Sequence, residues 1–484
     1  MKTNTLDFDA QALREKILDL AMRGKLVPQD PNDEPASVLL EKIKAEKEQL
    51  IKEKKIKKSK PLAPITDDEK PFDIPDSWEW VRLGDVNTYN SESVHPDRTP
   101  DKTFELYSVP IFPTRKPEII KGEEIRSNKQ AVETGDVLLC KINPRINRVW
   151  KVSNFTDNEN IASTEWIVVR QREITTEYLR YSLMAPYFRN LLQSNVSGVG
   201  GSLTRAKPRE VRNYVLPIPP LSEQSRIAAK IAQLFALLRK VESSTQQYAK
   251  LQTLLKSKVL DLAMRGKLVK QDPNDEPASE LLKKIKAEKA ELIKEKKIKK
   301  SKPLPPITDE EKPFDIPASW EWVRFDDILD VRDGTHDTPK YVSDGIPLIT
   351  SKNISSGYLD FINVKYISQQ DFKKINERSN VNKGDIIFAM IGTIGNPILV
   401  STDRKFAIKN VALLKKVTEK MSMPFVLDYL MIAQIWWNKR ATGAVQKFVS
   451  LRKIRSSLLP LPPLKEQNRI VNKIKKILTY EKEN

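Results

Sequence analysis

The sequence predicts an α+β protein, in which two similar mixed α/β domains are separated by a long-helix coiled-coil frame with pseudo-two-fold symmetry. Two repeats predict it. Residues 18–82 (LDLAMRGKLV…SWEWVR) recur as residues 260–324, with only 8 of 65 positions changed. Residues 216–231 (LPIPPLSEQSRIAAKI) recur as residues 459–474 (LPLPPLKEQNRIVNKI). Because joining the chain ends would regenerate the central stretch, one frame carries two different inserts.

At 484 residues the chain is longer than a usual single domain, so more than one compact core is expected. The positions of the repeats divide it into five segments. We predict an N-terminal frame region (1–77), a first domain (78–215), a central frame region (216–319), a second domain (320–458) and a C-terminal frame helix (459–484).

The frame segments have helical patterns. Apolar spacing predicts a short amphipathic helix over 9–23, and Lys-, Glu- and Leu-rich sequence predicts a protruding basic helical arm from Pro35 to about Lys58, repeated from Pro277. From Ser222 to Arg265 an apolar stripe with spacings of four and three predicts a coiled-coil rod of roughly 66 Å. The terminal helices carry matching stripes and are expected to form its partner as two pieces meeting end to end.

The two inserts share an order of elements although their residues differ. The first has candidate strands at 105–112, 136–142 and 161–170, then a helix over 175–194. The second has candidate strands at 346–349, 385–390, 398–401 and 406–415, then a helix over 424–440. Both contain a Gly-Asp turn that opens an apolar strand. We therefore expect one fold with two different surfaces.

Composition limits the chemistry. The net charge is +19, and residues 41–60 and 283–302 hold 12 of the excess positive charges. These arms are either solvated helix faces or a surface for phosphates or an acidic protein. A single cysteine, Cys140, and two histidines exclude disulfides and a Cys/His zinc site. We found no long apolar run and no signal peptide, so a soluble, cytoplasmic protein is expected.

Catalytic signatures are missing from the sequence. It contains no Walker loop, HExxH, DFG or GxSxG motif. The glycine cluster at 198–202 follows a helix, so a flexible loop is favoured over a phosphate cradle. The repeated tryptophans (Trp78, Trp80, Trp320, Trp322) either anchor each domain to the frame or stack on bases. Since both copies are the same, we predict anchors. The chain on its own is predicted to be non-catalytic.

Each insert does contain side chains suited to reading DNA bases, because Arg and Lys bridge guanine O6 and N7 and Asn or Gln bridges adenine N6 and N7. Each taken alone is more simply an ordinary solvated surface residue, and this alternative is favoured most strongly for the two histidines. The candidates for DNA binding are Lys141, Asn143, Arg145, Arg148, Ser202, Arg205 and Lys207 in the first insert, and Thr335, His336, Lys340, Lys352, Asn353, Gln446, Lys447 and Arg452 in the second.

The arrangement resembles the DNA-specificity subunit of type I restriction-modification systems over essentially the whole chain. The resemblance is carried by LPxPPLxEQxRI, by LDLAMRGKLVxQDPNDEPAS, and by the stretches GDVLLCKINPRIN, GGSLTRAKPREVRNY, GTHDTPKY, ITSKNI and GDIIFAMIGTIGN. It implies two target-recognition domains, each reading one half of a bipartite, asymmetric double-stranded DNA site, with the helices between them as a ruler.

The resemblance also implies partners. Such subunits bind two methylation subunits, which methylate adenine with S-adenosylmethionine, and restriction/translocase subunits, which use ATP and Mg. None of these cofactors is expected on this chain, and no membrane is implied. From the residues alone two other classes stay open: a structural or RNA-binding adaptor without sequence-specific DNA recognition, and an enzyme active by itself, which the missing motifs disfavour.

Overall fold

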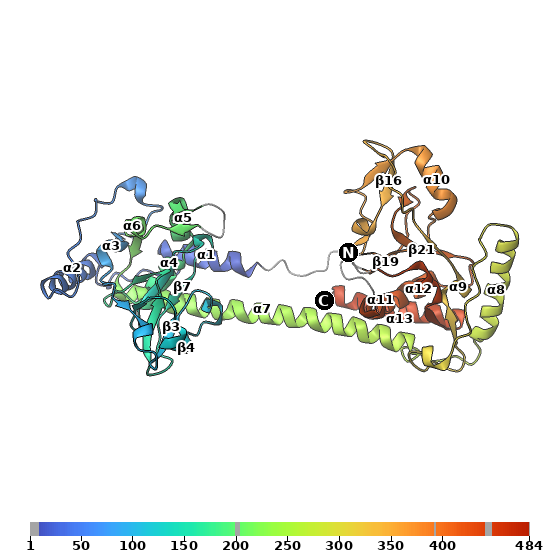
Figure 1. Cartoon of the computed structure of the whole chain (residues 1–484), viewed down its shortest axis with the longest axis horizontal. Helices are drawn as coiled ribbons and strands as arrows, with labels where there is room; N and C mark the ends of the chain where they lie inside the picture. The colour runs from blue at the N-terminus through green and yellow to red at the C-terminus, as the bar shows by residue number, and fades with distance from the viewer. Residues whose placement is uncertain (1–8, 199–203, 392–393, 441–447, 484) are drawn as a thin grey trace. The chain divides into compact units, whose positions relative to one another are not determined.

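The computed structural model describes residues 9–198, 204–391, 394–440 and 448–483. The chain forms two compact units that divide between Thr245 and Gln246 (Figure 1). We call residues 9–245 the first unit and residues 246–483 the second unit. Each contains one copy of the frame and one insert of mixed helices and strands, which confirms the predicted fold class.

The first unit begins with frame helices, continues through the insert and ends in the long helix α7. Its helices are α1 (Ala10–Met22), α2 (Ala36–Lys52), α3 (Leu83–Val86), α4 (Thr176–Met184), α5 (Pro186–Ser194), α6 (Pro208–Val211) and α7 (Leu221–Met264), whose last residues belong to the second unit. Its strands are β1 (Glu79–Arg82), β2 (Ser93–Val94), β3 (Thr103–Tyr107), β4 (Glu118–Lys121), β5 (Lys129–Ala131), β6 (Val137–Cys140), β7 (Val149–Lys151), β8 (Glu159–Ser163), β9 (Trp166–Val169), β10 (Val196–Ser197), β11 (Arg205–Ala206) and β12 (Val215–Ile218).

The second unit repeats this order. Its helices are α8 (Ala278–Lys294), α9 (Phe325–Ile328), α10 (Gln369–Ser379), α11 (Met423–Arg440), α12 (Leu451–Ser456) and α13 (Leu464–Glu483). Its strands are β13 (Glu321–Arg324), β14 (Leu329–Asp333), β15 (Tyr341–Val342), β16 (Ile346–Ile349), β17 (Lys365–Ile367), β18 (Ile386–Ala389), β19 (Gly395–Leu399), β20 (Ala407–Ile408), β21 (Val411–Lys416) and β22 (Leu458–Leu461).

A two-stranded antiparallel neck holds each insert on its frame. In the first unit β1 pairs with β12, so that Arg82 lies opposite Val215. In the second unit β13 pairs with β22, and Arg324 lies opposite Leu458. The chain therefore enters and leaves each insert at neighbouring points, although the two strands of a neck are far apart in sequence.

Each neck is followed by a Glu-Gln pair, Glu223-Gln224 or Glu466-Gln467, which we call the EQ motif. The contacts of this motif form the junction between insert and frame. Glu223 accepts a hydrogen bond from the Trp78 indole nitrogen at 2.9 Å, and Glu466 accepts one from Trp320 at 3.0 Å. Burial raises the pKa of Glu223, and the Trp78 and Gln29 donors oppose that rise. The junction ties the strand that enters each insert to the helix that follows it.

The next residues of the motif fasten the junction further. The Gln224 side chain accepts from the backbone nitrogen of Thr175 at 2.9 Å, and Gln467 accepts from that of Ser422 at 3.0 Å. Arg226 pairs with Asp33 at 2.6 Å, as Arg469 pairs with Asp275 at 2.6 Å. The same contacts therefore join insert, turn and helix in both units.

The repeated tryptophans are anchors, as predicted. Trp78 and Trp320 are each 3% exposed. Trp80 packs against Phe72, and Trp322 against Phe314, with ring centroids 5.1 Å apart in both units. The Trp80 ring also packs against Tyr187 of the insert, with ring centroids 6.3 Å apart, so it joins frame and insert.

A proline-rich strap follows each basic helix, residues 58–70 in the first unit and 300–312 in the second. Each strap is clamped by a buried arginine. The Arg82 guanidinium is 4% exposed; it donates to two strap carbonyls, to the carbonyl of Asn213 at 2.7 Å and to the Glu69 carboxylate. This contact lowers the pKa of Glu69 to about 2. Arg324 makes the equivalent contacts, with Glu311 as its carboxylate.

The basic arms differ from the prediction in length and in packing. The first arm's helix ends at Lys52, not near Lys58, because Lys54 takes a left-handed backbone conformation (φ 58°) and the strap follows. Nor does the arm protrude freely: its Leu39 and Ile43 are buried in the core. The Lys47 ammonium donates to the carbonyls of Gly84 and Asp85 at 2.7 and 2.9 Å, so one lysine of this basic arm serves as an anchor.

The apolar stripe of α7 is buried at its ends and exposed between them. Ile227 and Ile231 are 0% exposed and belong to the core of the first unit, which also contains buried residues of α1. Val259 and Leu260 lie in the core that holds Ile470 and Ile474 of α13. Val241, Tyr248, Leu251, Leu254 and Leu255 are exposed. The predicted unbroken helix over 222–265 is confirmed by α7, whereas coiled-coil packing of its stripe is wrong for the central residues. The end-to-end meeting of the terminal helices stays a prediction.

Each insert contains two larger sheets, and the first insert also contains the two-stranded pair β10-β11. The first has a five-stranded sheet (β2-β5-β8-β3-β4) and a three-stranded sheet (β7-β6-β9); the second has two four-stranded sheets (β15-β17-β16-β20 and β14-β21-β18-β19). Both Gly-Asp turns open a central strand, with φ of 90° at Gly135 and at Gly384, a conformation that favours glycine. The parallel pair β3-β8 corresponds to β16-β20, and the antiparallel pairs β6-β7 and β6-β9 correspond to β18-β19 and β18-β21, so the two inserts share these pairings, as expected for one fold.

One strand prediction fails at the same place in both inserts. The apolar run 161–170 is two strands, β8 and β9, and the run 406–415 is likewise β20 and β21. In each case the chain leaves one sheet, passes through Thr164-Glu165 or Lys409-Asn410, and enters the other sheet. The predicted helix over 175–194 is also divided, because Pro186 starts α5.

Replacing Arg324 tests the strap clamp. Arg324→Leu leaves several carbonyls and the Glu311 carboxylate without their donor, so the free energy of unfolding should fall by about 2–3 kcal/mol, below the full value for a buried pair because Glu311 is partly exposed. Lys312→Leu removes an exposed pair from the same strap and should cost less than about 1 kcal/mol. Urea unfolding followed by tryptophan fluorescence measures both, and equal losses would contradict the clamp.

Candidate nucleic-acid interface

The segment after β6 is a shaped loop that presents one arginine to solvent. Asn143 and Asn147 both have φ of 48°, a left-handed conformation that asparagine tolerates, and they bracket the turn Pro144–Ile146. The Asn147 side chain donates to the carbonyl of Leu183 at 3.0 Å. Arg145 is exposed, and its Nε donates to Asn143 Oδ1 at 3.0 Å. The loop therefore holds Arg145 in a defined direction.

Two further predicted residues come from a neighbouring segment. The backbone nitrogen of Asn143 donates to the carbonyl of Thr204 at 2.8 Å, and that of Ala206 donates to the carbonyl of Lys141 at 2.8 Å. These bonds bring Arg205 beside the loop, with Lys207 exposed just after it. Residues 141–148 and 204–207, together with Glu165, form what we call the first loop cluster. Ser202 lies outside the described residues.

Glu165 lies between two of the predicted cations. Its carbonyl accepts from the Lys141 backbone nitrogen at 3.1 Å. Its carboxylate is 3.9 Å from Lys141 Nζ and 3.4 Å from Arg205 Nε, and its side chain is 29% exposed. Arg148 does not pair with Glu165; its guanidinium donates to the carbonyl of Ile142 at 3.3 Å. The cluster is thus a basic surface with one carboxylate inside it.

In the second insert the loop after β14 lies against the turn before β21. The backbone nitrogen of Thr335 donates to the carbonyl of Ile408, and that of Asn410 donates to the carbonyl of Thr335, both at 3.1 Å. Lys409 donates to the Thr338 hydroxyl. Residues 333–340, 351–354 and 408–410 form what we call the second loop cluster. Lys340 is exposed at its edge.

His336 is held from both sides. Its Nε2 lies 2.9 Å from Asp333 Oδ2, and its Nδ1 lies 3.0 Å from Asn410 Oδ1. Two acceptors favour the doubly protonated ring, so the pKa of His336 is raised, with Asp333 as the main cause and Arg378, which also pairs with Asp333, opposing it. When protonated, His336 adds positive charge to this surface, and both of its ring nitrogens then already have acceptors.

The remaining candidates of the second insert divide by exposure. Lys352 is exposed on the short turn Ser351–Ile354. Asn353 is 5% exposed, and its side chain accepts from Thr350 and donates to the carbonyl of Asn363 at 2.9 Å, so its polar groups are used inside the domain. Arg452 is exposed at the start of α12. Gln446 and Lys447 lie outside the described residues.

Hydrogen bonds connect these segments to β19 and to the end of β18. The Asn396 side chain donates to the carbonyl of Ser355, just after the Lys352 turn, at 3.3 Å. The backbone nitrogen of Val449, just before α12, donates to the carbonyl of Met390 at 2.9 Å. The structure thus brings exposed cations to the equivalent strand ends, β6 and β18, in the two inserts. Whether these residues touch bases stays a prediction.

Sequence reasoning missed the residues that organise these cations: Glu165, Asp333, Arg378, Lys409 and Asn410. Glu165 and Asn410 lie inside apolar runs that were assigned to single strands. Asp333 lies at the end of strand β14, and Arg378 pairs with it across 45 positions of sequence. The one feature of the sequence that could have indicated Glu165 and Asn410 is the polar pair that interrupts the apolar run in each insert.

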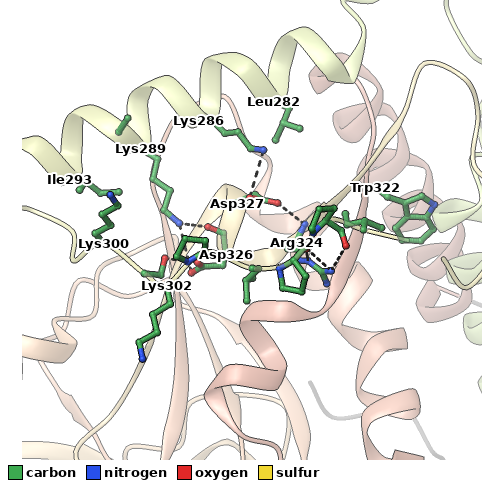
Figure 2. Close-up of a pocket in the computed structure, with 17 residues that line it drawn as sticks. Leu282, Lys286, Lys289, Ile293, Lys300, Lys302, Trp322, Arg324, Asp326 and Asp327 are labelled. Carbon is green, nitrogen blue, oxygen red and sulfur yellow. Dashed lines mark hydrogen bonds and ion pairs between the residues drawn. The ribbon is translucent and has the colours of Figure 1, made fainter. Parts of the chain in front are cut away.

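The frame carries a recess of about 590 Å³ between α8 and the strap of the second unit. Figure 2 shows α8 presenting Lys286 and Lys289 toward Asp327 and Asp326, at 3.7 and 3.9 Å. Burial lowers the pKa of Lys289. Lys302 extends from the strap at the left of the view, below Lys289.

Searches of the described residues gave two negative findings. We found no group of three or more His, Cys, Asp or Glu side chains there that could hold a metal ion. Within the same residues no helix is both long enough and apolar enough to cross a membrane.

A repeated frame with two inserts of one fold and two different basic loop clusters defines a specificity protein with two modules. The type I restriction modification DNA specificity domain matches residues 75–252 and again residues 317–483. The specificity subunit of the type I restriction enzyme EcoAI from Escherichia coli is 34% identical, over 97% of this chain and 89% of its own length. That of EcoEI, also from Escherichia coli, is 38% identical over 66% of this chain and 62% of its own length. The chain belongs to the family of type I restriction-modification DNA specificity proteins.

Solved structures agree on the fold. The HsdS subunit from Thermoanaerobacter tengcongensis gives a TM-score of 0.51 at 21% identity, over 85% of this chain and 92% of that chain. A chain from a study of complex assembly and conformational transition of the type I R-M system gives 0.59, at the same identity and the same coverage.

The two acceptors around His336 predict a measurable titration. A raised pKa means that the imidazolium's contribution to folding is fully present below the ordinary value of 6.5 and is lost as pH rises through the raised value. With ¹³C-labelled histidine the chain gives only two imidazole signals. The signal that His336→Gln removes should titrate above 6.5, and Asp333→Asn should lower its pKa without moving the His95 signal. Titration at or below 6.5 would contradict the geometry.

Proposed function

We propose that this chain is the sequence-reading subunit of a type I restriction-modification complex, and that each insert reads one half of a bipartite, asymmetric DNA site. The observation that carries the proposal is a repeated frame with unrepeated loop clusters. The neck and junction contacts are the same in both units, whereas the exposed cations near β6 and β18 differ. Two unlike surfaces on like supports suit two unlike half-sites.

The chemistry of the clusters supports readout of base edges in the major groove. Arg145, Arg205 and Lys352 are exposed, and arginine and lysine bridge guanine O6 and N7 there. Half-sites read from one face of the duplex are spaced by about one helical turn, roughly 34 Å. In this proposal the unread spacer is set by the length of α7, which has 44 residues and contributes to both units.

The proposal assigns catalysis to partners. Two methylation subunits would transfer the methyl group from S-adenosylmethionine, and restriction subunits would use ATP and Mg. The recess in Figure 2 supports docking of identical partners, because residues around it have close copies in the first unit. Lys300 and Lys302 correspond to Lys58 and Lys60, and all four are exposed.

Selection from randomised duplexes tests the reading of DNA. The full chain assembled with its partners should select two short motifs at a fixed spacing. Arg145→Ala should relax one motif only, and Lys352→Ala or Arg452→Ala the other only, by about 1–3 kcal/mol of base discrimination where a base is contacted. Uniform weakening across all sequences would indicate phosphate contacts. No selected motif would overturn the proposal in favour of a structural or RNA-binding adaptor.

Charge reversal at the recess tests docking. The pair Lys300→Glu and Lys302→Glu should reduce the bound methylation subunits from two to one, as should the pair Lys58→Glu and Lys60→Glu, since each reverses the charge of one docking surface. Native mass spectrometry of the purified assembly measures the ratio. Lys373→Glu with Lys374→Glu, exposed on α10, makes the same charge change outside the frame and should leave two bound. Two subunits retained in every variant would exclude this surface as the docking site.

A further inference from the structure

The turn where each insert crosses between its sheets occupies the same place in both. Trp166, the first residue of β9, pairs with Cys140 at the end of β6. Val411, the first residue of β21, pairs with Ala389 at the end of β18. Glu165 and Asn410, which directly precede these residues, are therefore equivalent positions, each beside the strand end from which the loop cluster extends.

In the first insert this position orders the cations. The Glu165 carboxylate lies 3.9 Å from Lys141 Nζ and 3.4 Å from Arg205 Nε, and these cations come from separate segments. At 29% exposure the carboxylate is part of the surface. Phosphate oxygens would be repelled by a carboxylate at this place, whereas the two cations are kept beside one another for base edges.

In the second insert the same position orders a different group. Asn410 has φ of 57°, and its side-chain oxygen faces His336 Nδ1 at 3.0 Å. The loop that carries His336 contacts the turn closely at Gly334. A Cβ added there would lie only 2.5 Å from the carbonyl oxygen of Ile408, so no larger residue fits. The loop that carries His336 is thus fixed by the turn in both main chain and side chain.

We infer that the residue at this turn, Glu165 in the first insert and Asn410 in the second, is a positioning residue that determines the base preference of its own half-site. It does so through Lys141 and Arg205 in one insert and through His336 in the other. The inference rests on the proposed function and adds to it the position that distinguishes the two reading surfaces. Its ligand is the major-groove edge of the bases.

Glu165→Gln is the direct test, made on the full chain assembled with its partners. Freed from the carboxylate, Lys141 and Arg205 can reach phosphates. Discrimination in the first half-site should fall by about tenfold or more, while affinity for random duplex rises and the slope of log affinity against log salt steepens by about one. A variant that merely unfolds would lose affinity for random duplex as well, so the gain separates the two causes.

Matched variants complete the test. Glu133→Gln removes the same charge from an exposed residue of the same insert, near the opposite end of β6, and should leave the motif unchanged. Glu165→Asp keeps the charge and should retain most of the preference. Asn410→Gly keeps the left-handed conformation, removes the amide and should relax only the second half-site.

The outcomes separate the inference from the proposed function. A wild-type assembly that selects no motif overturns the proposed function, and the inference with it. A wild-type motif that Glu165→Gln and Asn410→Gly leave as intact as Glu133→Gln does overturns the inference alone. Relaxation of one half-site by each turn variant supports both.

Discussion

The buried hydrogen bond between a tryptophan indole and the glutamate of the EQ motif is the contact on which each unit depends. It joins Trp78 to Glu223 and Trp320 to Glu466, across 145 and 146 positions of sequence. A buried carboxylate is costly without donors, so the junction forms only when the strand entering an insert and the helix following it have come together. The insert must therefore fold as a closed loop on the frame, and its neck fixes where its reading surface begins.

The contrast between repeated support and unrepeated surface shows how one architecture carries two different exposed surfaces. The neck pairing, the arginine clamp and the tryptophan–glutamate bond of the junction recur in both units, because their geometry is needed wherever an insert is attached. The turn between the sheets is different: it is ordered by the strands on either side, yet its side chain faces the surface. A carboxylate there organises cations in one insert, and an amide organises an imidazole in the other. The exposed loop clusters differ while the central strands keep equivalent pairings.

Much of this could be predicted from sequence. The repeats alone indicate the frame, the inserts and the long helix, since near-identical segments must form the same elements. What sequence could not show is the passage of residues 161–170 and 406–415 from one sheet to another, because an apolar run has the same pattern in one buried strand or two. The arm's early end at Lys52 also lacks a signal, since a lysine takes the left-handed position usually given to glycine. Exposed cations of the loop clusters were predictable as residue types, but Glu165 and Asn410 act through partners distant in sequence.

Each neck brings the two ends of its insert together, so that the insert can be exchanged as a unit. Arg82 faces Val215, and Arg324 faces Leu458, so everything between them begins and ends at adjacent points of an antiparallel ladder. A domain with neighbouring termini can be replaced there without disturbing the frame. The nearly identical flanking repeats also supply matched stretches of coding sequence at both borders. If each insert reads a half-site and the frame docks the partners, as proposed above, exchange of a whole insert between genes would change one DNA preference and leave the docking surface unchanged.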